Sequence, residues 1–187
     1  MAKKDFVQGF YPEFQLEKLV AKDDNRPILN YIYFAHGYAY ATDAHVGAKM
    51  RLTDICNFEE MDLPKLDGKF ITAKTYEQLR KCKHVIITDE GFQVLDKENP
   101  CLLSFVKDTE DWHYPSFDKV IDEAKEIKGK EPVTEVGMNS ELLYRLGKAF
   151  GSHRLWYKFG TPRNTILVYR GEQRGYGFTG IVMPFLL

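Results

Sequence analysis

Apolar and polar residues alternate over much of the chain, which predicts a protein rich in β-strands. We expect strands over residues 14–20, 28–34 and 38–52, with a hairpin turn at 35–38 and an irregular, acidic connection at 53–66. A short strand at 68–72 is followed by strong helix formers at 73–83 and by three further strands at 85–89, 92–96 and 101–106. The second part of the chain therefore has the order strand, helix and three strands.

The same order recurs in the last third of the chain. A helix that starts near Pro115 and has apolar residues at helical spacing comes first. A strand at 134–138, a helix capped by Asn139 or Ser140, and strands at 154–159, 164–170 and 176–187 follow it. The first part of the chain resembles such a unit without its helix. The pattern predicts an α+β fold of repeated strand–helix–three-strand units, with the helices on one face of antiparallel sheets.

Composition limits the classes of protein that fit. A chain of 187 residues, 44% of them hydrophobic, is long enough for one full domain or two small ones, which we place at 1–110 and 111–187. The net charge of −1 argues against general polyanion binding. Cys56, Cys82 and Cys101 lack metal-ligand spacing, so we expect reduced thiols and neither metal nor cofactor. The absence of a signal-like N-terminus or a membrane-length apolar run predicts a cytoplasmic protein without a membrane partner.

The stretch YAYATDAHVGAKMRL at 38–52 contains the most evident chemical candidates, Asp43 and His45. Two residues apart on a strand, they face the same side and fit a catalytic pair or two metal ligands. No further ligand or nucleophile with its own spacing accompanies them, so we expect no enzymatic activity. The favoured interpretation is a turn held by a hydrogen bond from the Asp43 side chain.

Two further features leave alternatives open. Residues 111–115 concentrate aromatic side chains beside a proline, which fits either a stacking surface for a peptide or the aromatic plug of a linker. The predicted helices at 73–83 and 140–150, with their exits, carry a modest excess of basic residues that would suit contact with DNA. These candidate DNA-binding residues are Lys74, Arg80, Lys81, Lys83, Arg145, Lys148 and Arg154.

Five stretches, in order, resemble the bacterial DNA polymerase III β subunit, the sliding clamp. They are YATDAHVGA at 40–48, LDGKFITAKTYEQLRK at 66–81, DWHYPSFDKVI at 111–121, EVGMNSELLYRLGKAF at 135–150 and IVMPFLL at 181–187. The chain is shorter than a clamp of three domains with two units each, and is similar to a middle domain joined to a final half-domain. Ala44, Val46 and Gly47 stand where the family has Gly, Arg and Leu, and Phe185 and Leu186 replace Met and Arg.

The resemblance implies a DNA-clamp-like fold and a pocket for a short peptide of a DNA polymerase or another protein with a clamp-binding motif. Carried over position by position, the peptide-binding residues are Thr42, Ala44, His45, Val46, Gly47, Pro115, Val120, Val182, Met183, Pro184 and Phe185. A pocket with Val, Met, Pro and Phe suits a short apolar anchor. Because Val46 and Gly47 differ from the family residues, the peptide that this pocket prefers is expected to differ from that of the family.

Three functions are compatible with these features. The first is a non-enzymatic processivity or recruitment factor of DNA replication that binds partner peptides and, through its basic helices, double-stranded DNA. Such a short chain needs several copies to form a ring, which makes a homo-oligomer part of this hypothesis. The second is a clamp-derived adaptor or decoy of a phage or mobile element that does not encircle DNA. The third, a small hydrolase using Asp43 and His45, ranks last.

Overall fold

The computed structural model describes residues 8–22, 25–96, 100–126, 135–160, 164–170 and 177–185. Its strands are β1 (Tyr31–Ala35), β2 (Tyr38–Thr42), β3 (Val46–Arg51), β4 (Lys69–Thr72), β5 (Val85–Ile87), β6 (Gly91–Val94), β7 (Cys101–Ser104), β8 (Leu155–Lys158), β9 (Ile166–Arg170) and β10 (Phe178–Val182). Its helices are α1 (Leu52–Ile55), α2 (Ala73–Leu79), α3 (Phe117–Glu126) and α4 (Ser140–Ala149), with short 3-10 turns η1 (Leu16–Lys18), η2 (Pro27–Asn30) and η3 (Leu63–Leu66).

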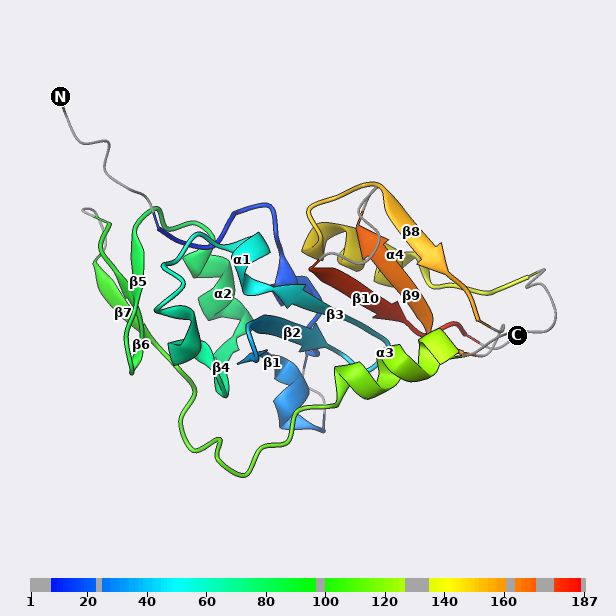
Figure 1. The fold of residues 1–187 in the computed structure, drawn as a ribbon, viewed down its shortest axis with the longest axis horizontal. Coiled ribbons are helices and arrows are strands. Elements are labelled where there is room, and N and C mark those ends of the chain that lie inside the picture. Colours follow the sequence, from blue (N-terminus) through cyan, green and yellow to red (C-terminus); the bar gives the residue numbers. More distant parts are fainter. Residues whose placement is uncertain are drawn as a thin grey trace.

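The strands form two antiparallel sheets (Figure 1). Seven strands have the order β4-β1-β2-β3-β10-β9-β8, and β5, β6 and β7 form a separate sheet at one end of the molecule. The last strand, β10, pairs with β3, so that Val182 lies opposite Val46 and Phe178 opposite Met50. This pairing joins the first and last parts of the chain in one continuous sheet.

The helices α2 and α4 cover the face of the large sheet that carries most of the core, which includes Tyr76, Leu146 and Phe150. Each helix begins at a side-chain cap, since Thr72 accepts a hydrogen bond from the Thr75 N–H and Asn139 from the Glu141 N–H. The third helix, α3, contradicts the expectation that all helices lie on one face of the sheets. Its buried residues pack on a second cluster on the opposite face of the sheet. The pattern could not assign a face to α3, because a helix with one apolar stripe fits either side of a sheet with two apolar faces.

The N-terminal segment 8–22 is a strap across the helical face. The expected strand at 14–20 is wrong: the segment turns through η1, which lies against both α2 and α4. Leu16 and Leu19 are fully buried in the main core, and Phe14 packs on Phe178 of β10. The strap therefore covers part of the sheet that the first unit leaves bare through its missing helix.

The order strand, helix and three strands is confirmed for β4, α2 and β5–β7, and the last part of the chain repeats it from the helix onward, as α4 and β8–β10. The predicted hairpin turn is also confirmed, since His36 and Gly37 link β1 and β2 with positive φ angles of 52° and 76°, as in a two-residue turn of type I′. Several elements are shorter than expected. The strand expected at 28–34 begins only at Tyr31, after η2, and those expected at 85–89, 101–106 and 176–187 are the shorter β5, β7 and β10. The helix α2 ends at Leu79, and the strand expected at 134–138 is a single bridge from Gly137 to Phe185, with residue 134 outside the described part. No helix among the described residues is both long and apolar enough to cross a membrane.

Candidate functional site

A tight corner connects β2 to β3. The Asp43 carboxylate accepts hydrogen bonds from the N–H groups of His45 and Val46 at 2.8 and 2.9 Å. The Thr42 hydroxyl donates to the Val46 carbonyl and accepts from the N–H of Ala44, at the tip of the corner. Ala44 has a φ of 75°, a left-handed conformation that disfavours residues other than glycine. The hydrogen bonds that the Asp43 carboxylate accepts confirm the interpretation of this stretch as a turn.

The second oxygen of Asp43 is also engaged. It forms an ion pair of 2.6 Å with Arg145 of α4, and the Arg145 side chain donates a further hydrogen bond to the Lys18 carbonyl of the strap. One arginine thereby holds together the corner, the strap and α4. Across the described residues no group of three or more His, Cys, Asp or Glu side chains is arranged to hold a metal ion. The geometry gives Asp43 a role in shaping the corner.

A cavity of about 660 Å³ lies beside this corner. Its walls come from the corner, the N-terminal end of α4 and the segment after β10, and the lining residues are Asp43, His45, Met138, Asn139, Ser140, Leu142, Arg145, Met183, Pro184 and Phe185. The Met183 N–H donates to the His45 carbonyl, and the Phe185 N–H donates to the Gly137 carbonyl. Met183 and Phe185 are about half exposed, at 43% and 52%. The cavity is therefore apolar on one wall and open to a ligand.

The eleven predicted peptide-binding residues fall into different places. His45, Met183, Pro184 and Phe185 line the cavity. Those buried in the fold are Thr42, Val46, Gly47 and Val182. Ala44 is exposed at the tip of the corner, while Pro115 precedes α3 and Val120 belongs to it. The structure thus brings four of the predicted residues to one cavity.

The sequence reasoning missed the contribution of α4 to this cavity. Met138, Asn139, Ser140 and Leu142 line it, although none was among the predicted contact residues. The sequence indicates Asn139 only as a helix cap. A signal was present, since this helix start lies within one of the five stretches that resemble the clamp, but its meeting with residues 183–185 depends on the tertiary fold.

Close packing of α3 explains why Gly47 is buried. A Cβ atom at residue 47 would lie 2.6 Å from the ring of Phe117 and 2.9 Å from the Thr42 side chain. Phe117 is only 3% exposed and packs edge-on against Tyr40. Nearby, Lys49 of β3 pairs with Asp118 of α3. Partial burial lowers the Lys49 pKa, but the hydrogen bond to Asp118 and the surrounding negative potential outweigh it, so the pKa is raised above its usual value.

The aromatic segment before α3 is packed against the sheet. Trp112 contacts the rings of Tyr31 and Phe70, and Tyr114 stacks on Tyr33. These contacts correspond to the linker plug that was one of the two interpretations of residues 111–115.

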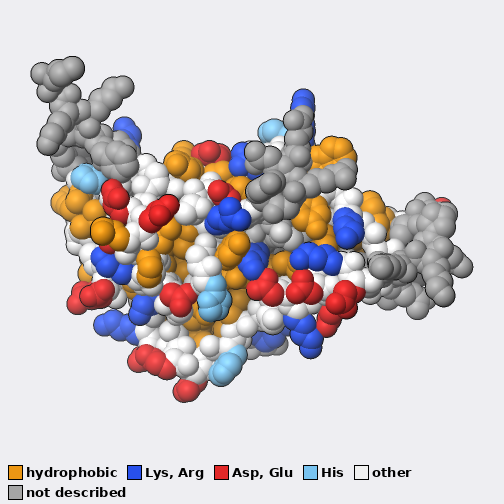
Figure 2. Space-filling view, viewed as in Figure 1, with side chains coloured by type: hydrophobic (Ala, Val, Ile, Leu, Met, Phe, Trp, Pro, Cys, Tyr) orange, Lys and Arg blue, Asp and Glu red, His pale blue; other side chains and the backbone are white. Residues whose placement is uncertain are grey.

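Figure 2 shows acidic and basic side chains intermixed on the visible face.

The predicted DNA-binding residues lie partly along a groove between α2 and α4. This cavity of about 900 Å³ is lined by the cations Lys18, Lys22, Lys74, Arg145 and Lys148, but also by the anions Glu17, Asp43, Glu77 and Glu141. Lys83 and Arg154 are exposed outside it. The charges of the groove nearly balance, so its attraction for phosphate depends on which cations are free to leave their partners.

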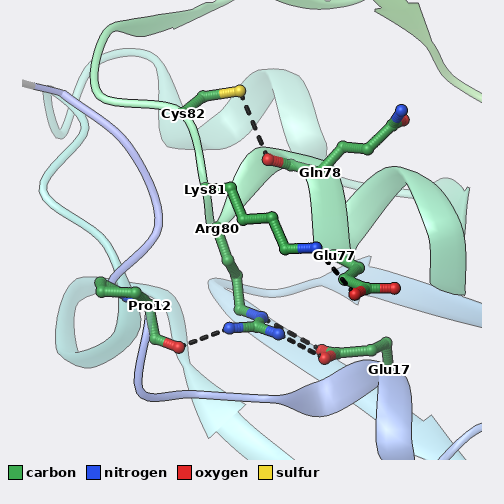
Figure 3. A network of polar contacts seen from close by, with 7 residues as sticks. All are labelled: Pro12, Glu17, Glu77, Gln78, Arg80, Lys81 and Cys82. Carbon is green, nitrogen blue, oxygen red and sulfur yellow. Dashed lines mark hydrogen bonds and ion pairs between the residues drawn. The ribbon is translucent and has the colours of Figure 1, made fainter.

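The side chains of two arginines and one lysine of the predicted DNA-binding set form hydrogen bonds or ion pairs within the fold. The Arg80 guanidinium forms two hydrogen bonds to the Glu17 carboxylate and one to the Pro12 carbonyl (Figure 3). The Arg80 and Glu17 side chains are only 9% and 5% exposed. Arg145 is held by Asp43 and the Lys18 carbonyl, and Lys81 pairs with Glu77. Contact with DNA through Arg80 would require the strap to move.

Known structures identify this arrangement of sheets and helices. The chain is similar, over its full length, to the DNA polymerase sliding clamp of Pseudomonas aeruginosa, with 12% identity, a TM-score of 0.58 and 68% of that chain covered. The chain has the sliding-clamp fold. It is similar over its full length to DNA polymerase III subunit beta of Borrelia burgdorferi, with 13% identity, a TM-score of 0.60 and 66% of that chain covered. It is also similar over its full length to the H. pylori beta clamp, with 10% identity, a TM-score of 0.61 and 68% of that chain covered.

The likeness to sliding clamps is confined to structure. No protein-family model matches the sequence. No curated protein matches it in sequence either. The resemblance seen in five short stretches is thus confirmed at the level of the fold, and the chain spans about two thirds of each of these clamps.

Proposed function

We propose that this protein is a clamp-like DNA replication factor without enzymatic activity, which binds a short apolar peptide segment of a DNA polymerase or another partner. The observation that supports it is the cavity beside the Asp43–His45 corner, in a chain with the sliding-clamp fold. Its volume of about 660 Å³ lies within the usual range for ligand pockets, and Met183, Pro184 and Phe185 supply an apolar wall. Partner peptides would insert there.

A paired substitution tests this pocket. Met183→Ala combined with Pro184→Ala removes apolar surface from the wall and should abolish binding of a peptide that carries the clamp-binding motif of a polymerase. Met61→Ala is the matched control, because Met61 is 80% exposed and does not line the cavity. Titration calorimetry measures the affinity, and circular dichroism verifies the fold. Equal affinity of the double variant and Met61→Ala would exclude this pocket.

Contact with double-stranded DNA is the second part of the proposal. Lys74 and Lys148 line the groove between α2 and α4 and are candidate phosphate contacts. Such contacts release counterions, so binding to a fluorescent duplex should weaken steeply as salt is raised, and each lysine that is changed to Gln should reduce the salt slope by about one. Salt-independent or absent binding would argue against this part.

Assembly into a larger ring would require sheet edges that other copies can use. The edge strands β7 and β8 lie at opposite ends of the molecule (Figure 1). Each carries exposed apolar residues, Leu102 on β7 and Trp156 on β8. Edge strands with exposed apolar side chains are templates for strand addition. Light scattering at high concentration should therefore detect an oligomer, and Trp156→Glu should reduce it to a monomer.

The alternative is a clamp-derived adaptor or decoy that binds peptides but does not encircle DNA. The near balance of charges in the groove between α2 and α4 favours it. A monomer at high concentration, together with peptide binding and no salt-sensitive binding to DNA, would select this alternative over the replication clamp.

A further inference from the structure

The predicted peptide-binding residues are divided by a single aromatic ring. His45 and the segment 183–185 line the cavity, whereas Pro115 and Val120 belong to the α3 side. Between them, on the α3 face of the sheet, lies Gly47, two residues after His45. The ring of Phe117 sits directly over Gly47.

Phe117 leaves little surface for a ligand at this place. Its ring would be 2.6 Å from a Cβ atom at residue 47, and it is 3% exposed. The neighbours on this face are closed as well, since Thr42 is 3% exposed and Leu167, which belongs to the same cluster as Phe117, is not exposed at all. The ring thus occupies space that a side chain at residue 47 would otherwise take, and the surrounding packing seals it.

The position of Phe117 is fixed by several contacts on α3. Its ring packs against Tyr40 at 5.6 Å between centroids and stacks on Tyr114 at 6.5 Å. The next residue, Asp118, pairs with Lys49 of β3. With an aromatic contact on one side and an ion pair on the other, the start of α3 is held on the sheet.

We propose that Phe117 closes the α3 side of the peptide site, so that the protein recognises a neutral, extended segment with a single apolar anchor. This inference rests on the proposed function for the identity of the cavity. The walls of the cavity select the anchor. Met138, Leu142, Met183 and Phe185 provide an apolar surface, and methionine side chains adapt to different anchor shapes. Asp43 and Arg145 neutralise each other at the rim, which gives no preference for a charged ligand.

Peptides of equal length test the closure directly. One probe is a blocked hexapeptide of serines with a single Phe, and two others carry in addition a Leu two residues before or after the Phe. That spacing spans about 7 Å of extended chain and matches the two-residue step from His45 to Gly47 in the sequence. Methyl NMR shifts of Met183 measure binding. The wild type should bind all three peptides within about twofold, because the second anchor finds no site.

Phe117→Ala should open that second site. We expect at least one of the Leu-containing peptides to bind this variant about tenfold more tightly than the single-anchor peptide, as burial of one Leu side chain permits. Phe159→Ala, at an exposed residue away from the cavity, is the control and should behave as the wild type. The inference is overturned if the wild type already prefers a Leu-containing peptide tenfold, or if Phe117→Ala gains no preference.

Xenon provides a measurement that does not depend on peptide binding. An apolar space left by removal of the ring should hold xenon in Phe117→Ala but not in the wild type, as read by chemical shifts of residues next to Gly47. Should Phe117→Ala fail to fold, Phe117→Val serves in its place. A folded variant without xenon overturns the closure, whereas xenon binding without any peptide binding supports the closure and rejects the proposed function.

Discussion

Replacement of Arg80 by Met tests whether this arginine belongs to the fold or to a DNA surface. The substitution keeps most of the aliphatic stem and removes the charge. It leaves the Glu17 carboxylate, whose side chain is 5% exposed, without the two hydrogen bonds from Arg80 (Figure 3). It also removes the hydrogen bond from Arg80 to the Pro12 carbonyl, which attaches the strap to the end of α2.

The size of the effect follows from burial. Breaking a buried ion pair by removal of one partner destabilises proteins by about 3–5 kcal/mol, since the other charge stays buried. An exposed pair contributes less than about 1 kcal/mol. The pair of Lys81 with Glu77 is such a case, at 67% and 46% side-chain exposure, so Lys81→Met is a matched control on the same helix region. We expect Arg80→Met to lose several times more unfolding free energy than Lys81→Met.

Urea unfolding followed by circular dichroism measures the unfolding free energy of both variants. Duplex binding is measured without urea, at a temperature at which each variant is folded. The double variant Glu17→Met, Arg80→Met should recover most of the loss, because neither charge is then left alone. An equal, small loss for Arg80→Met and Lys81→Met would refute the structural role. A fall in DNA affinity for folded Arg80→Met, without a stability loss, would assign Arg80 to the DNA surface.

Two further predictions concern single side chains. Ala44→Gly should stabilise the protein by roughly 1 kcal/mol in urea unfolding, because glycine adopts the left-handed conformation at the corner without steric penalty; a loss of stability would contradict the strain. Burial raises the Tyr76 pKa well above 10, and its hydroxyl has no hydrogen-bond partner in the described part of the chain. Stability from this group is therefore complete below about pH 10 and lost as pH rises further. Tyr76→Phe should lessen alkaline unfolding and add about 1 kcal/mol at neutral pH, and equal alkaline sensitivity of both proteins would contradict it.

Local features of the fold could be predicted from the sequence. The turn at His36–Gly37 and the cap at Asn139 each depend on residues next to one another in the chain. The segment 14–20 was misassigned because its apolar positions fit a strand, whereas their burial depends on α2 and α4, which are distant in sequence. Arg80 likewise pairs with Glu17, which is 63 residues away, and the local sequence around Arg80 does not indicate this partner.

The site shows the same division between local and distant determinants. The Asp43 turn was predictable because its donors are two and three residues away. The contribution of α4 and the closure by Phe117 were not, because they bring together segments separated by about a hundred and by seventy residues.

The two substitutions at the corner act in opposite directions on the fold. Where the family resemblance has glycine, Ala44 stands in a left-handed conformation that it adopts with strain. Where it has leucine, Gly47 removes the side chain that would collide with Phe117. The first substitution alters only the exposed tip, while the second lets Phe117 of α3 pack on the surface of the sheet. Gly47 and Phe117 therefore form one packing unit, and a larger residue at 47 would be compatible with this fold only if the start of α3 moved away and exposed the surface that Phe117 now covers.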